Sequence, residues 1–435
     1  MTKKAAAPSI RFKGFSDAWE QRKVGDFYDF KNGLNKGKAF FGKGTPIVNF
    51  TDVFHKRGIT TQMLRGRVTL TPSEISNYGV KQGDIFVTRT SETIEEIGYA
   101  SVMLDSPKDT VFSGFVLRGR AIKEDPLTLK FKQFVFSTDA FRSEMIKKSS
   151  MTTRALTSGT AIKKMYFQYP VSTEEQNRIG QFLESLDHLI TLHQRKYEKL
   201  TNVKKSMLEK MFPQNGSSYP EIRFKGFTDP WEQRKFGDIT ELKSASRVHK
   251  GEWTDSGVPF FRSSDVMAAI NGTTNEKAYI SEELYQKLSS VSGKLEKGDV
   301  LITGGGSVGN PYIVPNNEPL YTKDADLLWI KNQGRFHPYY LYEYFFSPTF
   351  RTHLSSISHV GTIAHYTITQ LSETPICLPD IEEQVKVGEY FESLDNLITL
   401  HQRKPPHKKR RCSDVNRYEA NRFVLRFFCK MGYGV

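Results

Sequence analysis

The chain contains little cysteine and no long apolar segment. Its three cysteines, Cys377, Cys412 and Cys429, form no Cys-x-x-Cys pair and no Cys/His cluster, which argues against a disulfide framework and a zinc site. The apolar runs are shorter than a membrane-spanning helix requires, and the opening residues contain no hydrophobic signal segment. We therefore expect a cytoplasmic protein that uses neither a membrane nor a bound metal.

The sequence also lacks recognisable catalytic motifs. Gly33–Lys38 has the wrong spacing for a nucleotide-binding P-loop, and no lysine follows the glycine cluster Gly304–Gly309. Asn310-Pro-Tyr312 lacks the second proline and the companion glycine motif of amino-methyltransferases, so we interpret it as a turn. No nucleophile elbow of a hydrolase is evident. A chain of this length without catalytic machinery is expected to lend specificity to something else.

The net charge of +14 is less informative than it first looks. A basic chain favours a nucleic-acid partner. However, the residues from Arg403 to the end supply +8 of the +14, so the remaining body is only mildly basic. Charge alone therefore leaves DNA binding open.

The most informative feature is an internal repeat. Ile10–Asp26 and Ile222–Asp238 are identical at 14 of 17 positions, and Glu174–Lys196 and Glu382–Lys404 are identical at 16 of 23. The interiors between these blocks hardly resemble each other. The offsets of 212 and 208 residues are far too long for a solenoid unit. We predict two domains of one ancestry whose interiors have diverged, as two readers of two different targets would.

Each interior combines strand and helix signals. Short apolar runs bounded by turn residues, such as Gly83–Thr88, Val111–Leu117 and Gly298–Thr303, predict strands. Residues 129–148 and 338–354 have helical spacing. The predicted fold class is therefore α+β, with a skeleton that the two interiors share even where their residues differ.

Glu174–Phe212 is expected to be one long helix, about 57 Å in length. A heptad of apolar residues runs along it with one break at Lys204, which favours a coiled coil over a globular surface helix. The copy of this helix would supply its partner. The predicted seam residues are Ile179, Leu183, Leu186, Ile190, His193, Tyr197 and Leu200 on the first helix, and Val387, Phe391, Leu394, Ile398 and His401 on the second. An antiparallel pair would relate the repeats by a pseudo-two-fold axis and fix the distance between two DNA half-sites.

These residues together resemble the specificity subunits of type I restriction–modification enzymes over nearly the whole chain. Trp19–Asp26 and its copy Trp231–Asp238 open each half. Gly-x-Pro segments at Gly44 and Gly257 follow, and then Gly-Asp-Ile/Val strands at Gly83 and Gly298. The pairs Gly159-Thr160 and Gly361-Thr362 precede Glu174-Glu-Gln176 and Glu382-Glu-Gln384, which open the helices. Each signal is weak alone, but the ordered set occurs twice.

The resemblance implies a DNA-binding subunit that is not itself an enzyme and carries no cofactor. Each interior would be a target recognition domain for one half of a split, asymmetric sequence in double-stranded DNA. The spacer helices would dock two methyltransferase (modification) subunits, which methylate adenine, and restriction subunits would complete the complex. S-adenosylmethionine, ATP and Mg would be bound by those partners. The implied parts are a recognition domain at 1–173, a spacer helix at 174–212, a linker at 213–221, a recognition domain at 222–381, a second helix at 382–404 and an atypical basic tail at 405–435.

The residues expected to touch DNA are those whose side chains suit bases or phosphates and that lie in loops beside predicted strands or just before the long helix. In the first domain they are Lys36, Lys38, Arg65, Arg67, Thr88, Arg89, Thr90, Arg154 and Thr160. In the second they are Ser244, Arg247, Arg262, Ser263, Ser264, Thr303, Ser307, Thr362 and His365.

The chain departs from the family after Lys404. Pro405 and Pro406 would end the second helix where its copy continues, and the heptad is lost. An altered reading frame or a natural variant tail would both explain this, and we do not interpret the tail as a DNA-binding patch. Two other functions remain open on the sequence: a self-sufficient DNA-modifying enzyme, which the missing motifs disfavour, and a stand-alone DNA-binding regulatory protein.

Overall fold

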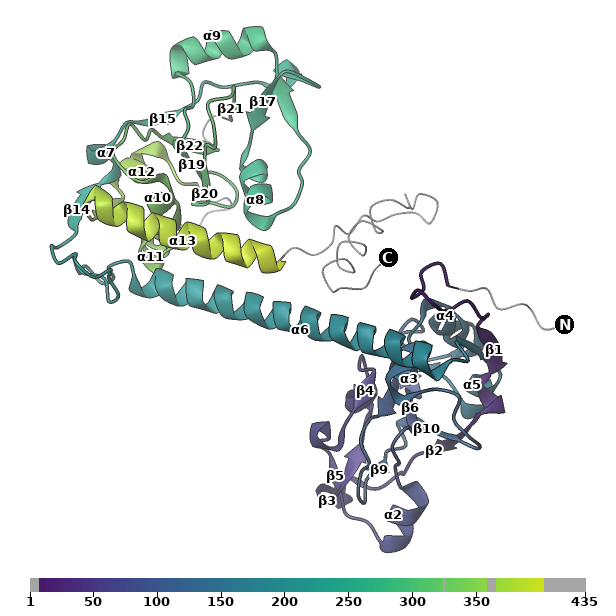
Figure 1. Cartoon of the computed structure of the whole chain (residues 1–435). Coiled ribbons are helices and arrows are strands. Elements are labelled where there is room, and N and C mark those ends of the chain that lie inside the picture. Colours follow the sequence, from purple (N-terminus) through teal and green to yellow (C-terminus); the bar gives the residue numbers. More distant parts are fainter. Residues whose placement is uncertain (1–7, 324–325, 358–364, 403–435) are drawn as a thin grey trace. The chain divides into compact units, whose positions relative to one another are not determined.

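The computed structural model describes residues 8–323, 326–357 and 365–402, and the chain divides into two compact units between Thr191 and Leu192 (Figure 1). Thr362 and the tail 405–435 lie outside the described residues. In the described part, no helix has both the length and the apolar character needed to cross a membrane.

The first unit is built on a five-stranded sheet in the order β2-β10-β6-β8-β4. Its strands are β2 (Tyr28–Asn32), β4 (Gly58–Ile59), β6 (Ile85–Thr88), β8 (Ala100–Met103) and β10 (Val116–Ala121). All pairs are antiparallel except β4–β8. Two small sheets lie beside it, made of β3 (Phe41–Val48), β5 (Arg67–Val68) and β9 (Val111–Phe112), and of β7 (Thr90–Ser91), β11 (Ser150–Met151) and β12 (Ala155–Leu156).

The helices of the first unit are short. They are η1 (Val24–Asp26), η2 (Lys38–Phe40), α1 (Phe50–Val53), η3 (Thr61–Met63), α2 (Pro72–Tyr78), α3 (Leu129–Val135), α4 (Asp139–Lys148) and α5 (Gly159–Lys163). Apolar side chains from β6, β10, α3 and α4, including Ile85, Leu117, Phe131 and Phe141, form the main core. Burial of this apolar surface is the principal force that stabilises the unit.

The second unit repeats the central sheet with the order β15-β22-β19-β20. These strands are β15 (Leu242–Ser244), β19 (Val300–Thr303), β20 (Pro311–Ile313) and β22 (Leu327–Ile330), all antiparallel. A second sheet contains β16 (Trp253–Thr254), β17 (Val258–Phe261), β18 (Ala278–Ile280) and β21 (Tyr321–Thr322). The helices are α7 (Phe236–Ile239), η4 (Lys250–Glu252), α8 (Ser263–Asn271), α9 (Glu282–Ser292), α10 (Pro338–Tyr344), α11 (Pro348–Ile357) and α12 (Ile368–Glu373).

The predicted α+β class and the shared skeleton are confirmed, because β2-β10-β6-β8 and β15-β22-β19-β20 follow the same order. One predicted strand is wrong. Val111–Leu117 is divided into β9 and β10 by a turn at Gly114 and Phe115. Apolar residues on both sides of this turn are buried, so the periodicity of the sequence does not reveal it.

The two repeated sequence blocks meet in space within each unit. In the first, β1 (Glu20–Lys23) pairs with β13 (Tyr166–Tyr169), and in the second β14 (Glu232–Lys235) pairs with β23 (Pro375–Leu378). Beside each pair, one Glu side chain is buried at the start of a long helix, α6 (Thr173–Lys210) or α13 (Ile381–Gln402). The repeat therefore encodes the junction between each domain and its long helix.

An Arg–Glu–Trp clamp closes this junction in both units. Arg223 donates from Nε and Nη2 to the two carboxylate oxygens of Glu383, at 2.7 and 2.8 Å, and Trp231 Nε1 donates to the same carboxylate at 3.0 Å. Arg11 and Glu175 make the equivalent bidentate pair at 2.6 and 2.7 Å. Bidentate pairing of a planar guanidinium is strong and directional, so it fixes the angle at which the helix leaves the domain.

The helix pair is antiparallel within the second unit. His193 contacts His401 with Nδ1 atoms 2.8 Å apart, and further along Lys204 binds Asp395 at 2.6 Å. Just after α6 ends, the ring of Phe212 stacks on the ring of Phe391. Contacts further toward the C-terminal end of α6 are made with residues nearer the N-terminal end of α13, so the two helices run in opposite directions (Figure 1).

The predicted seam is only partly a helix–helix seam. Val387, Phe391 and Leu394 are buried, but the first two belong mainly to the core of their own domain, which also contains Tyr340. Ile179 likewise packs on the core of the first unit. Ile190 is 54% exposed, which contradicts its assignment to a packed seam. The apolar stripe therefore begins as a surface that docks each helix onto its own domain.

The remaining seam residues differ in exposure. The structure places Leu183, Leu186, Tyr197, Leu200, Ile398 and His401 in half-buried positions and leaves His193 exposed apart from its contact with His401. Lys204, the break in the heptad, has a defined role. Its ammonium group binds Glu343 of α10 at 2.8 Å as well as Asp395.

Candidate nucleic-acid interface

Two predicted contact residues, Thr88 and Thr303, are fully buried. Thr88 ends β6, and its hydroxyl accepts a hydrogen bond from Tyr99 N at 2.8 Å. Thr303 ends β19, accepts from Asn310 N at 2.9 Å and donates to Ser307 O at 2.5 Å. A hydroxyl that is enclosed and already bonded within the fold is not available to DNA. These predictions are wrong, and both threonines instead hold the loop that follows them.

The residue that directly follows each threonine takes part in the same backbone hydrogen bonds, which join three segments of the chain. Arg89 N donates to Phe115 O at 3.1 Å, and Thr157 N donates to Arg89 O at 3.0 Å. The second unit has the same arrangement, with bonds of 2.8 Å from Gly304 N to Asp326 O and from Tyr366 N to Gly304 O. We call this meeting point the loop junction. It joins the loop after the threonine strand, the turn before the next strand of the sheet and the segment that precedes the long helix.

The first loop junction gathers three of the predicted residues. Thr90 lies on β7 and pairs with Leu156 on β12. Arg154 occupies the turn between β11 and β12 and forms an exposed ion pair with Glu92 at 3.0 Å. Arg89 is half-buried beside them, and Thr160 is exposed on the following α5. The sequence did not single out Phe115, whose side chain projects into solvent here.

The four other predicted cations of the first domain lie on or near the small sheet made of β3, β5 and β9. Lys36 forms an ion pair with Glu74 at 2.8 Å and lies over the Phe40 ring. Arg67 donates to the carbonyl oxygens of Leu64 and Gly66 at 2.8 Å. Both are therefore partnered within the fold, whereas Lys38 and Arg65 are exposed.

The second loop junction brings together small polar side chains. His365 forms a β-bridge with Gly305, and Ser307 is exposed on the same glycine-rich loop. Ser263 Oγ donates to Asp326 O at 3.0 Å, which places the start of α8 at this junction. The neighbouring Ser264 accepts a hydrogen bond from Asn275 at 2.9 Å.

The remaining predicted residues of the second domain lie apart from this group or are already engaged. Arg262 donates from Nε to Asp265 at 3.0 Å and covers the Trp253 ring, so its guanidinium serves the local fold. Arg247 is exposed in the loop after β15, and Ser244 is exposed at the end of that strand.

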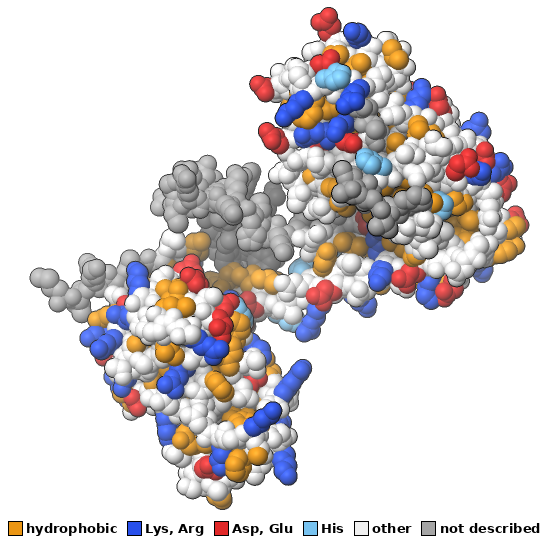
Figure 2. All heavy atoms as spheres, turned by 180° about the vertical axis from the view of Figure 1, so that it is seen from behind, with side chains coloured by type: hydrophobic (Ala, Val, Ile, Leu, Met, Phe, Trp, Pro, Cys, Tyr) orange, Lys and Arg blue, Asp and Glu red, His pale blue; other side chains and the backbone are white. Residues whose placement is uncertain are grey.

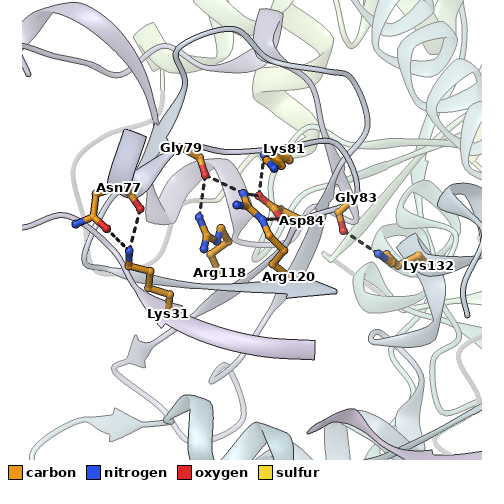
Figure 3. A network of polar contacts seen from close by, with 9 residues as sticks. All are labelled: Lys31, Asn77, Gly79, Lys81, Gly83, Asp84, Arg118, Arg120 and Lys132. Carbon is orange, nitrogen blue, oxygen red and sulfur yellow. Dashed lines mark hydrogen bonds and ion pairs between the residues drawn. The ribbon is translucent and has the colours of Figure 1, made fainter. Parts of the chain in front are cut away.

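A polar network in the first unit shows why basic residue counts overstate the surface available to DNA (Figure 3). Arg118 and Arg120 of β10 both donate to Gly79 O at 2.8 Å, and Arg120 also binds Asp84. Lys132 donates to Gly83 O at 2.8 Å. Burial lowers the pKa of Arg118 and of Lys132, which are held inside the fold. These cations position the loop before β6.

The surface charges are mixed. In the view of Figure 2, Lys and Arg side chains project from both units and are interspersed with Asp and Glu. This pattern agrees with the mildly basic body of the chain.

Comparison with known proteins gives one consistent result. The family model of the type I restriction modification DNA specificity domain matches residues 16–202 and again residues 228–407. A putative type I restriction enzyme specificity subunit of Haemophilus influenzae is 30% identical over 172 residues, which make up 38% of this chain and 41% of that protein. The MjaVIII specificity subunit of Methanocaldococcus jannaschii is 24% identical over 277 residues, or 60% of this chain and 64% of that one. The chain thus spans less than two thirds of either relative.

A longer match and a solved structure extend the comparison. The putative MjaX specificity subunit of Methanocaldococcus jannaschii is 23% identical over 88% of both chains. The S subunit of a type I restriction–modification system from M. genitalium has the same fold, with a TM-score of 0.55 and 13% identity over 91% of this chain and 94% of that one.

Proposed function

Because this chain belongs to the type I restriction modification DNA specificity family and carries two of its domains, we propose that it reads a split, asymmetric DNA sequence. Each loop junction contributes to the reading of one half of that sequence. The chain supplies recognition and no catalysis, and partner subunits methylate or cleave the DNA that it selects. The comparisons give no support to a stand-alone regulator.

The observation that carries this proposal is the pair of loop junctions. Their backbone hydrogen bonds are the same, whereas their side chains differ. Arg89 and Phe115 in the first domain stand where Gly304 and Asp326 stand in the second. Arginine can donate to guanine, and a carboxylate can accept from cytosine N4. Two unlike sets of side chains on one frame suit two unlike half-sites.

The spacer helices support a role for partner subunits. Leu192 on α6, and Leu397 and Leu400 on α13, are exposed apolar residues close in sequence to His193 and His401, where the helices meet. Exposed apolar side chains in a group are typical of protein–protein contacts. We propose that two methyltransferase subunits bind here and carry S-adenosylmethionine, and that restriction subunits with ATP and Mg complete the complex.

The test is to coexpress the chain with a cognate modification subunit and to map methyladenine across the genome by long-read sequencing. We expect one split motif that disappears when this chain is omitted. A stable complex that methylates no defined motif would contradict the proposal. Methylation that persists unchanged without this chain would assign the specificity to another protein.

A further inference from the structure

Phe115 is a large apolar side chain that projects into solvent from a turn held by backbone hydrogen bonds. It is 65% exposed, although the residues around it, Ser113 and Val116, are buried. Its carbonyl oxygen accepts from Arg89 N at 3.1 Å. The preceding Gly114 lies so close to Asn35 that a Cβ there would come within 2.0 Å of the Asn35 Oδ1 atom. The fold thus fixes the turn while the ring gains nothing from burial.

The surroundings of the ring suggest a ligand with an apolar group beside negative charge. Arg89 donates its backbone N–H to the Phe115 carbonyl oxygen, so a basic residue lies directly across the hydrogen bond from the ring-bearing residue. In the major groove of DNA, the apolar group on a base edge is the C5-methyl group of thymine, which aromatic side chains contact, and phosphates lie to either side. An exposed ring on a turn that is hydrogen-bonded to an arginine residue matches this pattern.

The second domain does not repeat the feature. The structurally equivalent residue is Asp326, whose carbonyl oxygen accepts the corresponding bond from Gly304 N at 2.8 Å. The Asp326 carboxylate forms an ion pair with Lys323. An apolar contact is therefore possible at the first junction and not at this position of the second.

We propose that Phe115 is a specificity residue of the first domain and that its ring contacts the C5-methyl group of a thymine in the first half-site. This inference rests on the proposed function. It specifies the base that is read and the group on that base that is contacted. The residue it names makes an apolar contact, unlike the hydrogen-bonding residues expected at such a site.

The experiment uses the complex of the full chain with its modification subunits and a duplex that contains the mapped motif. Each thymine of the first half-site is replaced in turn by deoxyuridine, which removes only the C5-methyl group. We expect one replacement to weaken binding about fourfold, as burial of a single methyl group implies. The Phe115→Ala complex should bind the thymine duplex more weakly and should no longer distinguish it from that deoxyuridine duplex.

A matched control lies at the other end of the same strand. Ile122 follows β10 as Phe115 precedes it, and it is 61% exposed. Ile122→Ala should retain wild-type affinity and wild-type sensitivity to deoxyuridine, and Phe115→Leu should retain part of both. Discrimination at the second half-site reports that each variant is folded and assembled.

Two results would overturn the inference. One is a Phe115→Ala complex that still discriminates thymine from deoxyuridine as the wild type does. The other is a wild-type complex that tolerates every deoxyuridine replacement in the first half-site, as a ring that wedges between base steps would. Neither result would affect the proposed function, which fails if the complex methylates no defined motif or if methylation persists unchanged without this chain.

Discussion

At the scale of single residues, two deeply buried glutamates belong to the scaffold of the described chain. Glu175 and Glu383 are buried at the starts of the two long helices, and each is bound by an arginine from the opening block of the same repeat. A buried ion pair of this kind is costly to break, because removal of one partner leaves the other charge unpaired and desolvated. The repeated residues Arg11, Arg223, Trp19 and Trp231 are thus explained by the fold alone.

Arg223→Ala should therefore destabilise the second unit by about 3–5 kcal/mol. Urea unfolding followed by tryptophan fluorescence measures this, since three of the four tryptophans, Trp231, Trp253 and Trp329, lie in that unit. The control is Arg234→Ala, which removes an exposed ion pair with Glu232 and should cost no more than about 1 kcal/mol. Equal effects of the two variants would show that the clamp contributes no special stability.

Residue type alone could predict some of the candidate site and not the rest. Arg89, Thr90 and Arg154 can be predicted because they follow a strand or precede the helix, and the structure brings them together. Thr88 and Thr303 were misassigned because a threonine at a strand end can face either the loop or the core, and its side-chain direction depends on tertiary packing. Phe115 was missed because apolar residues in a strand pattern suggest burial, and Gly114 was the one sign of a turn.

At the scale of elements, the residue that breaks the apolar heptad of α6 forms specific contacts between helices. Lys204 reaches Glu343 of α10 and Asp395 of α13, so one ammonium group links three helices. Periodicity could predict the helix and the repeat its partner, whereas the antiparallel orientation is an implication of the family resemblance. It could not predict this contact, because Glu343 and Asp395 lie 139 and 191 residues away in the sequence.

The heptad by itself would suggest that Lys204→Leu strengthens the helix pair. The structure predicts the opposite, because the substitution leaves the carboxyl groups of the buried Glu343 and the half-buried Asp395 without the hydrogen bonds that Lys204 Nζ donates. We expect a loss of about 1–3 kcal/mol in the free energy of unfolding of the second unit. Addition of Glu343→Gln should recover part of the loss. A Lys204→Leu variant that is more stable than the wild type would refute this account.

Glu343 should also give the second unit a characteristic pH dependence. Burial raises the pKa of its carboxyl group to about 8, although Lys204 opposes the shift. Between the ordinary pKa of a glutamate and about 8, the folded state holds a proton that the unfolded state has released, so stability falls as the pH rises through this window and levels off above it. Denaturant unfolding between pH 5.5 and 8.5 measures the slope. Glu343→Gln should flatten the slope, whereas Glu232→Gln, at an exposed position, should leave it unchanged.

At the scale of the whole molecule, the repeat predicted from the sequence is a repeat of the backbone arrangement that supports each interior. The order of four strands, the clamp and the loop junction recur, and the sequence blocks at offsets of 212 and 208 residues are the parts that build the clamp. These features could be predicted from the sequence because they depend on local blocks that the chain states twice. The small sheets around each interior could not, since they depend on pairings particular to each domain.

If α6 sets the separation of the two half-sites, its length should appear in the DNA sequence that is read. Duplication of residues 184–190 adds one heptad, lengthens the helix by about 10 Å and nearly preserves its apolar face. Methyladenine mapping should then show the two halves of the motif about three base pairs further apart, with the bases in each half unchanged. The control is a seven-residue insertion at Asn215–Gly216, a turn within the second unit, which should leave the spacing as it was. An unaltered spacing after the heptad insertion would exclude the helix as the ruler.

The loop junction has a consequence for how such a chain can change over generations. Its hydrogen bonds run between main-chain atoms, so they survive a change of the side chain at Arg89 or Phe115. A mutation there changes the side chain that the domain presents to DNA and removes no backbone hydrogen bond of the loop junction. Surface substitutions of this sort typically alter the free energy of unfolding by less than about 0.5 kcal/mol. New preferences are therefore reachable by single codon changes, with no stabilising mutation required beforehand.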